Sequence, residues 1–307
     1  MTPPTIALAG ASGDLGSRIA RALVRRGATV RALIRPGTSD SEQTHLKALG
    51  LTLVPADPLD AAALTATLEG VSCVVSALNG LRGVIVERQG ALLDAAVAAG
   101  VPRLIPSDFS EDFTQTQPGD NRNLDLRREL MARADHAQIA VTSILNGAFM
   151  DMLGAEMPIL QPGIRRVLYW HDADQPLDFT TKDDVAAYVA AAALDGTTPR
   201  FLKIAGDSLS ARALAATMTE VIRILSISLT NQDSSGLPTP RPEPVSLPLA
   251  SARISIVFAN DSIGVRIIRI PFVSCRNRDS ADPSTPRPEP VFLLLAPLEF
   301  SGVFNTF

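Results

Sequence analysis

A loop with three regularly spaced glycines near the start of the chain constrains the fold more than any other feature. Gly10, Gly13 and Gly16 stand between a short apolar run, Thr5–Ala9, and an alanine-rich run with helical periodicity, Ser17–Arg26. Such glycines permit a tight turn, let the backbone approach a phosphate, and allow the helix to pack closely on the strand. The alternative is a glycine-rich turn without a ligand, but the flanking strand and helix favour a dinucleotide-binding loop.

Short β-rich runs and longer helical runs alternate beyond this loop. The expected strands are Thr5–Ala9, Thr29–Ile34, Leu51–Pro55, Cys73–Ala77, Arg103–Pro106 and Ala140–Leu145. The expected helices are Ser17–Arg26, Ser41–Leu49, Ala61–Leu68, Glu87–Ala99 and Leu124–Ala134. Alternation of this kind is typical of parallel strands joined by right-handed helical crossovers. The sequence therefore predicts an α/β fold with a doubly wound parallel sheet of the Rossmann type, followed by a small, atypical C-terminal region.

The alternation of strands and helices becomes less regular after the last of these strands. We expect two further strands, over Arg166–Trp170 and Arg200–Ala205. We also expect two further helices: one begins near Thr181 or Asp183, and the other covers Ser210–Ile224 and is capped by Ser208 or Ser210. We assign residues 1–221 to the nucleotide-binding domain, which includes part of a substrate lobe at about 150–180.

The tail, residues 222–307, differs in composition from the rest of the chain. It contains no lysine, is rich in proline and serine, and repeats the seven residues Thr239–Val245 as Thr285–Val291. Ile256–Phe258, Val265–Ile270 and Val291–Leu295 resemble strands. Proline-rich segments bury little surface. Two hypotheses for the tail are disorder and an altered reading frame of the coding sequence.

The residue that closes the second expected strand indicates which dinucleotide the loop binds. An NAD site places an acidic residue about 20 positions after the loop, where it accepts hydrogen bonds from the ribose. Here Arg35 stands at that place, and no carboxylate follows before Asp40. A guanidinium suits the 2′-phosphate of NADP(H), to which Arg18 would add charge, whereas a solvated surface arginine is the alternative. The predicted contacts are Gly10, Ser12, Gly13, Asp14, Leu15, Gly16 and Arg35, with Asp57, Ser76, Ala77 and Leu78 at later strand ends.

Composition excludes several other classes of function. The 307 residues carry a net charge of -4, which argues against a nucleic-acid partner, since phosphate backbones need a basic face. No apolar run reaches the roughly 18–20 residues of a membrane span, and no secretion signal is recognised. The two cysteines, Cys73 and Cys275, and the three histidines lack metal-ligand spacing. We expect no metal and a cytoplasmic protein with unpaired thiols.

Four segments together resemble the NmrA-like and isoflavone-reductase-like group of atypical short-chain dehydrogenases/reductases. They are the glycine loop, Arg31–Arg35, Ile105–Phe109 and Thr142–Phe149; Phe179–Ala186 and Leu202–Asp207 fit the same pattern, so the likeness covers about residues 4–221. The resemblance implies a monomer or homodimer that binds NADP(H). Reductase members of the group transfer hydride to aromatic or phenolic substrates, while regulatory members bind the dinucleotide without turnover.

The resemblance also implies site residues around the nicotinamide. Ser107 and Asn146 would contact the cofactor, Asp108 would act beside it, and Phe109 and Phe149 would contact the substrate. The reductases carry a lysine on the helix that follows the Pro-Ser-(Asp/Glu)-Phe strand end, and its place falls near Arg127. Arginine is a poor acid–base catalyst near neutral pH, so a surface or phosphate-side role for Arg127 and a loop-capping role for Asp108 are alternatives.

Three functions follow from these observations. The first is an NADPH-dependent reductase of a small carbonyl, quinone or aromatic acceptor, because the cofactor supplies the difficult chemistry. The second is a non-catalytic NADP(H) sensor of the NmrA type that regulates a protein partner, which the missing lysine favours. The third is a damaged homologue that binds the cofactor poorly.

Overall fold

Six parallel strands form the central sheet of the protein, in the order β3-β2-β1-β4-β5-β6. Their bounds are β1 Thr5–Ala9, β2 Thr29–Ile34, β3 Thr52–Pro55, β4 Cys73–Ser76, β5 Arg103–Ile105 and β6 Ala140–Val141. The structure is a computed structural model, and it describes residues 3–57, 60–153, 159–161, 166–169, 172–230, 245–249, 252–259 and 262–268. The strand order confirms the predicted doubly wound sheet, whose connections reverse direction between β1 and β4.

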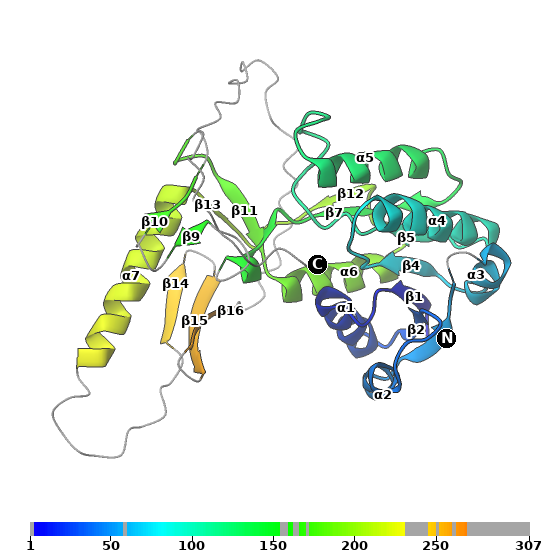
Figure 1. Cartoon of the computed structure of the whole chain (residues 1–307), viewed down its shortest axis with the longest axis horizontal. Helices are drawn as coiled ribbons and strands as arrows, with labels where there is room; N and C mark the ends of the chain where they lie inside the picture. The colour runs from blue at the N-terminus through cyan, green and yellow to red at the C-terminus, as the bar shows by residue number, and fades with distance from the viewer. Residues whose placement is uncertain are drawn as a thin grey trace.

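Helices cover both faces of this sheet (Figure 1). They are α1 Asp14–Arg25, α2 Asp40–Ala48, α3 Ala61–Thr67, α4 Gln89–Ala98, α5 Arg122–Ala134 and α6 Lys182–Leu194. On one face Ile6 and Leu8 of β1 join a core with α1 and α6, and on the other face Ala7 and Ala9 join a core with α3 and α4. Because successive side chains of a strand point to opposite faces, a strand covered on both sides is apolar throughout.

Two predicted elements are divided in the structure, while the strand predicted over Arg166–Trp170 covers Arg166–Val167 and the helix predicted to end at Ile224 continues to Thr230. The single strand expected over Ala140–Leu145 is divided into β6, which pairs with β5, and β7 Ser143–Leu145, which pairs with β12 Phe201–Lys203. The break falls at Thr142, whose hydroxyl donates to the Pro199 carbonyl at 2.9 Å and so draws the chain toward β12. The helix expected from Glu87 is preceded by a π-helix, η1 Gly83–Arg88, and α4 begins only at Gln89.

A smaller lobe follows the central sheet. Its elements are β8 Ala148–Phe149, η2 Met150–Met152, β9 Leu160–Gln161, β10 Arg166–Val167, β11 Leu177–Thr180, β13 Asp207–Leu209 and α7 Ala211–Thr230. Figure 1 shows this lobe beside the sheet, with α7 along its outer side. The Thr181 hydroxyl accepts a hydrogen bond from the Asp184 amide at the start of α6, and Ser210 accepts one from Ala213, which confirms two of the predicted caps.

Part of the tail forms a three-stranded antiparallel sheet. Its strands are β14 Val245–Leu249, β15 Ala252–Ala259 and β16 Ser262–Ile268. The strands predicted at Ile256–Phe258 and Val265–Ile270 therefore coincide with β15 and, up to Ile268, with β16. The strand predicted at Val291–Leu295 and the second proline-rich copy lie outside the described residues.

Further expectations concern thiols and membrane spans. Cys73 is unpaired in the core of the sheet, where burial raises the pKa of its thiol to about 12. Cys275 lies outside the described residues. Among the helices that the structure describes, none combines the length and the apolar character needed to cross a membrane.

Arg103 stabilises the junction between β5 and the turn that follows α6. Its side chain is buried, and its guanidinium donates to the Thr142 hydroxyl at 2.6 Å and to the carbonyls of Thr198 and Gly196 at 3.0 and 2.9 Å. We predict that Arg103→Met lowers the free energy of unfolding by about 3 kcal/mol, because these acceptors lose a charged donor. Urea denaturation measures the change, with Arg21→Met on the exposed side of α1 as the control; equal losses in both variants would contradict the prediction.

Candidate functional site

The glycine loop brings α1 into very close contact with the end of β1. Gly10 adopts a positive φ of 82°, and a Cβ atom there would lie 2.6 Å from the Ala77 carbonyl oxygen. A Cβ atom at Gly16 would overlap the Gly10 carbonyl oxygen, so the helix rests directly on the loop. Gly13 is the N-cap residue of α1, and no described side chain caps its amides. The first turn of α1 therefore presents open N–H groups and the positive end of the helix dipole, which suit a phosphate.

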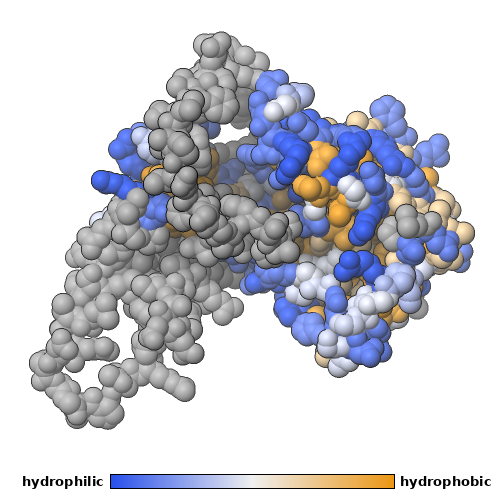
Figure 2. All heavy atoms as spheres, in the orientation of Figure 1, coloured by the Kyte–Doolittle hydropathy of each residue, from blue (hydrophilic) through white to orange (hydrophobic). Residues whose placement is uncertain are grey.

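A cavity of about 290 Å³ lies beside this loop at the carboxyl ends of β1 to β4. Its lining combines an apolar floor with a polar rim and consists of Ala9, Gly10, Ala11, Ser12, Leu33, Ile34, Arg35, Thr38, Glu42, Leu46, Ala56, Leu64, Leu78, Asn79, Val84, Arg88 and Leu92. Figure 2 shows apolar side chains gathered between α5 and α1 on the visible face, with hydrophilic ones around them. An apolar floor with a charged rim suits an adenosine group whose ribose carries phosphate.

Four of the predicted cofactor contacts line this cavity: Gly10, Ser12, Arg35 and Leu78. The loop residues Gly13, Asp14, Leu15 and Gly16 lie next to it at the start of α1. Ser76 is the last residue of β4, and Ala77 lies against Gly10. After β3, Ala56 lines the cavity, whereas the predicted Asp57 does not. Sequence reasoning did not identify Asn79, Glu42 or Arg88. Arg88 had no signal in the sequence, because it reaches the cavity from η1.

Asp14 and Arg18 connect the start of α1 to the start of α6. The Asp14 carboxylate accepts from Arg18 at 2.8 Å and from Lys182 at 3.0 Å, and Arg18 also pairs with Asp183 at 2.7 Å. Partial burial alone would raise the pKa of Asp14, but the hydrogen bonds from Arg18 and Lys182 outweigh it and lower that pKa. Arg18, expected to add charge beside Arg35, is instead paired with these carboxylates and is not among the cavity residues.

Buried polar atoms gather at the ends of the neighbouring strands. Ser76 at the end of β4, Asp108 after β5 and Asn146 after β7 are each at most 1% exposed. The Ser76 hydroxyl oxygen, Asp108 Oδ1 and Asn146 Oδ1 have no hydrogen-bond partner among the residues described. Buried polar atoms are rarely left unpaired, so these three mark a place where a ligand or an ordered water would supply the missing partners. Ser107, beside them, donates its amide to Gln89 at 2.8 Å.

Asp108 lies in a polar cluster between β5, β7 and α5. Its Oδ2 accepts from the Ser143 hydroxyl at 2.6 Å, and that hydroxyl accepts from Arg200 at 2.8 Å. Burial raises the pKa of Asp108, against the opposing effects of the Ser143 hydrogen bond and the charges of Arg127 and Arg200. The Arg127 pKa is lowered by burial, while the Asp108 charge opposes this. The arrangement can hold a proton on the carboxyl group beside a partly buried cation.

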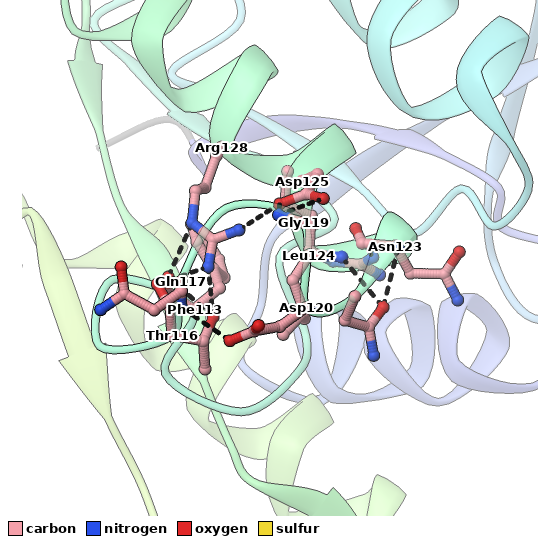
Figure 3. Close-up of polar contacts among 11 residues, drawn as sticks. Phe113, Thr116, Gln117, Gly119, Asp120, Asn123, Leu124, Asp125 and Arg128 are labelled. Atoms are coloured by element: carbon pink, nitrogen blue, oxygen red, sulfur yellow. Dashed lines mark hydrogen bonds and ion pairs between the residues drawn. The ribbon is translucent and has the colours of Figure 1, made fainter. Parts of the chain in front are cut away.

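Arg127 lies on α5, and the next residue, Arg128, attaches that helix to the loop before it. Figure 3 shows the Arg128 guanidinium at the centre of the loop that precedes α5, where it donates to the carbonyls of Phe113 at 3.1 Å and Thr116 at 2.7 Å and pairs with Asp125. Successive residues of a helix point about 100° apart. Arg128 therefore holds the loop while Arg127, whose Nε is buried without a partner in the described part of the chain, contributes to the field around Asp108.

The two predicted substrate residues lie in different surroundings. Phe109 is 7% exposed and belongs to the core between the sheet and α1. Phe149 is partly buried and packs against the same core from β8. Among the residues that the structure describes, no group of histidine, cysteine, aspartate and glutamate side chains could hold a metal ion.

Comparison of the sequence with known proteins finds one matching family and several curated relatives. The model of the NmrA-like family matches residues 2–229. Pinoresinol reductase 1 of Arabidopsis thaliana is 28% identical over 201 residues, which cover 60% of this chain and 63% of that protein. An NmrA-like family domain-containing oxidoreductase of Gibberella moniliformis is 27% identical over 229 residues, 68% and 74% of the two chains. The match thus spans 63% of the length of the two Arabidopsis pinoresinol reductases.

Solved structures share the fold. A crystal structure of isoflavone reductase has a TM-score of 0.64 at 21% identity and covers 76% of this chain and 84% of that one. The structure of AtPrR2 with NADP+ and (+)pinoresinol has a TM-score of 0.60 at 24% identity, with 72% and 76% covered. At these identities the likeness establishes the architecture of the chain.

The raised pKa of Asp108 predicts a pH dependence of stability. Between the ordinary aspartate pKa, about 4, and the higher folded-state value, the folded protein holds a proton that the unfolded chain releases. The contribution of Asp108 to the free energy of unfolding therefore falls as the pH rises through that window, by up to about 1.4 kcal/mol per pH unit.

Asparagine does not titrate and retains an oxygen that accepts from Ser143. We therefore predict that the stability of Asp108→Asn relative to the wild-type protein increases between pH 4.5 and 7.5, as measured by urea unfolding at several pH values. Parallel curves for the two proteins would show that Asp108 titrates normally.

Proposed function

The chain belongs to the NmrA-like family, and from that premise we propose that it is an NADP(H)-dependent oxidoreductase that transfers hydride to a small carbonyl, quinone or aromatic acceptor. The observation that carries the proposal is the Arg35 guanidinium on the rim of an apolar cavity next to the glycine loop. The curated relatives of the chain include pinoresinol reductases and a fungal oxidoreductase, and this supports a reductase activity of some kind. As the family resemblance implies, we propose a monomer or homodimer, and from the composition we propose a cytoplasmic location.

The chain offers a cradle that fits the phosphates of the dinucleotide. The amides after Gly13 would bind the pyrophosphate, and the absence of a side chain at Gly10 and Gly16 keeps the loop close enough to the sheet for this contact. Ser12 and Arg35 would bind the ribose and its 2′-phosphate, since guanidinium and phosphate form charge-assisted hydrogen bonds. Leu78 would contact the adenine from the floor of the cavity.

The buried polar atoms of Ser76, Asp108 and Asn146 would face the nicotinamide half. When bound, the reduced nicotinamide supplies the hydride. Burial raises the pKa of Asp108 and so favours its protonated form, from which it would pass a proton to the oxygen of the acceptor as charge develops there. Arg127 would stabilise that charge without titrating itself. Phe149 would border the acceptor, with Phe109 supporting the wall from the core.

A second function rests on one specific observation. Arg127 stands on α5 where the reductases of this group carry a lysine, and the sequence contains no lysine between Lys47 and Lys182. A protein with this substitution that binds NADP(H) without turnover would act as a redox sensor for a protein partner. Calorimetric titration with NADPH, followed by NADPH oxidation with a panel of quinones and aromatic aldehydes, separates the two functions.

We expect turnover with at least one acceptor, and a fall in kcat of about tenfold or more in Asp108→Asn. Tight binding of NADPH without its oxidation by any acceptor would contradict the reductase function and favour the sensor function. The absence of binding would refute both functions.

Arg35 is predicted to determine the choice between the two dinucleotides. We expect Arg35→Gln to weaken NADP+ binding by about tenfold or more and to leave NAD+ binding within about twofold, because only NADP+ carries the 2′-phosphate. Equilibrium titration of both cofactors measures the ratio. Arg21→Gln removes one exposed positive charge from α1 and serves as the control; equal losses for NADP+ and NAD+ in Arg35→Gln would contradict the assignment.

A further inference from the structure

A second arginine, Arg88, lines the cavity beside the glycine loop. It is the last residue of η1, whereas Arg35 follows β2, so the two guanidiniums reach the same cavity from different elements. Both side chains are exposed, and neither guanidinium has a hydrogen bond or ion pair with any residue that the structure describes. Arg18, at the start of α1, is by contrast paired with Asp14 and Asp183.

The packing of η1 explains why Arg88 faces the cavity. Ile85 and Val86 are buried and contact Leu126 of α5, so they fix one side of η1 against that helix. Arg82, at the start of η1, forms an ion pair with Glu129 of α5. The next residue, Gln89, is buried and donates to the Ile85 carbonyl at 3.2 Å.

The cavity side of the same helix carries residues at intervals of four. Val84, Arg88 and Leu92 all belong to the lining, with the arginine between two apolar side chains. Residues four apart lie on the same side of a helix. Ile85 and Val86 hold the opposite side. Arg88 therefore has no side-chain partner in the described part of the chain and is available to a ligand in the cavity.

The charges of the lining favour a role for this second arginine in binding a dianion. Three of the lining residues that the structure describes are charged: Arg35, Arg88 and Glu42 of α2. Without Arg88, the positive charge of Arg35 is cancelled by the negative charge of Glu42. With Arg88 the lining is positive by one charge, and two guanidiniums face the two negative charges of a phosphate monoester at neutral pH. A purine is neutral and finds its apolar contacts on Leu33, Leu64 and Leu78.

We propose that Arg88 is a specificity residue that binds the 2′-phosphate of the dinucleotide together with Arg35. The inference rests on the proposed function, since it assigns a residue to the same cofactor site. It predicts that preference for a 2′-phosphorylated nucleotide depends on a residue of η1 as well as on the residue at the end of β2.

The test compares ligands that differ only in the 2′-phosphate. Adenosine 2′,5′-bisphosphate and AMP form one pair, and NADP+ and NAD+ form the other. Their dissociation constants are measured by calorimetry at 0.15 M salt for the wild-type protein, Arg88→Gln and Arg88→Lys. We expect Arg88→Gln to weaken both 2′-phosphorylated ligands by about tenfold and the other two by less than about twofold. Arg88→Lys keeps the charge and should recover part of the loss.

Arg21→Gln is the matched control, because Arg21 is exposed on α1 and is not among the residues that line the cavity. It should leave all four dissociation constants within about twofold, since bulk solvent screens its charge. An equal loss of affinity for all four ligands in Arg88→Gln would indicate that Arg88 contacts the purine and would overturn the proposal. Unchanged affinity for all four ligands would also overturn it. Failure of the wild-type protein to bind any of the four would refute the proposed function as well, so the two failures are distinguishable.

Discussion

The site depends on the contact between Gly16 of α1 and the carbonyl group of Gly10. That contact leaves no room for a side chain, and Gly10 itself meets the Ala77 carbonyl in a left-handed conformation. The consequence is that α1 starts directly above the sheet, with its open amides at the carboxyl ends of the strands. A larger residue at either glycine would move the helix and with it every contact that its first turn makes, including the ion pairs from Asp14 to Arg18 and Lys182.

Two chemically different regions extend from this contact along the edge of the sheet. Toward β2 and β3 the cavity is apolar at its floor and positive at its rim, so it suits a phosphorylated adenosine. Toward β5 and β7 the region is buried and polar, with atoms of Asp108 and Asn146 that have no hydrogen-bond partner among the described residues. Under the proposed function, charge on the first region would decide which nucleotide binds. Burial in the second region would favour the protonated form of Asp108 that the proposed hydride transfer uses.

Local patterns were sufficient to predict strands β1 to β5, the glycine loop, the place of Arg35 after β2 and the cap at Thr181, because each depends on neighbours in the sequence. Arg88 was not predictable, since no local pattern marks the π-helix and only packing on α5 orients η1. The break at Thr142 likewise depends on a hydrogen bond to Pro199, which is remote in the sequence. The apolar character of Phe109 did not reveal that it faces the core rather than a substrate.

Hydrogen exchange with and without NADP+ tests the central claim most directly, because it locates the ligand on the chain. We predict slower exchange in peptides that cover the glycine loop and the start of α1, residues 10–18, and the end of β2, residues 33–38. The groove between the ends of α4 and α5, which includes Val97 and His136, should be unchanged. Protection confined to that groove, or unchanged exchange in the glycine loop at saturating NADP+, would contradict the account.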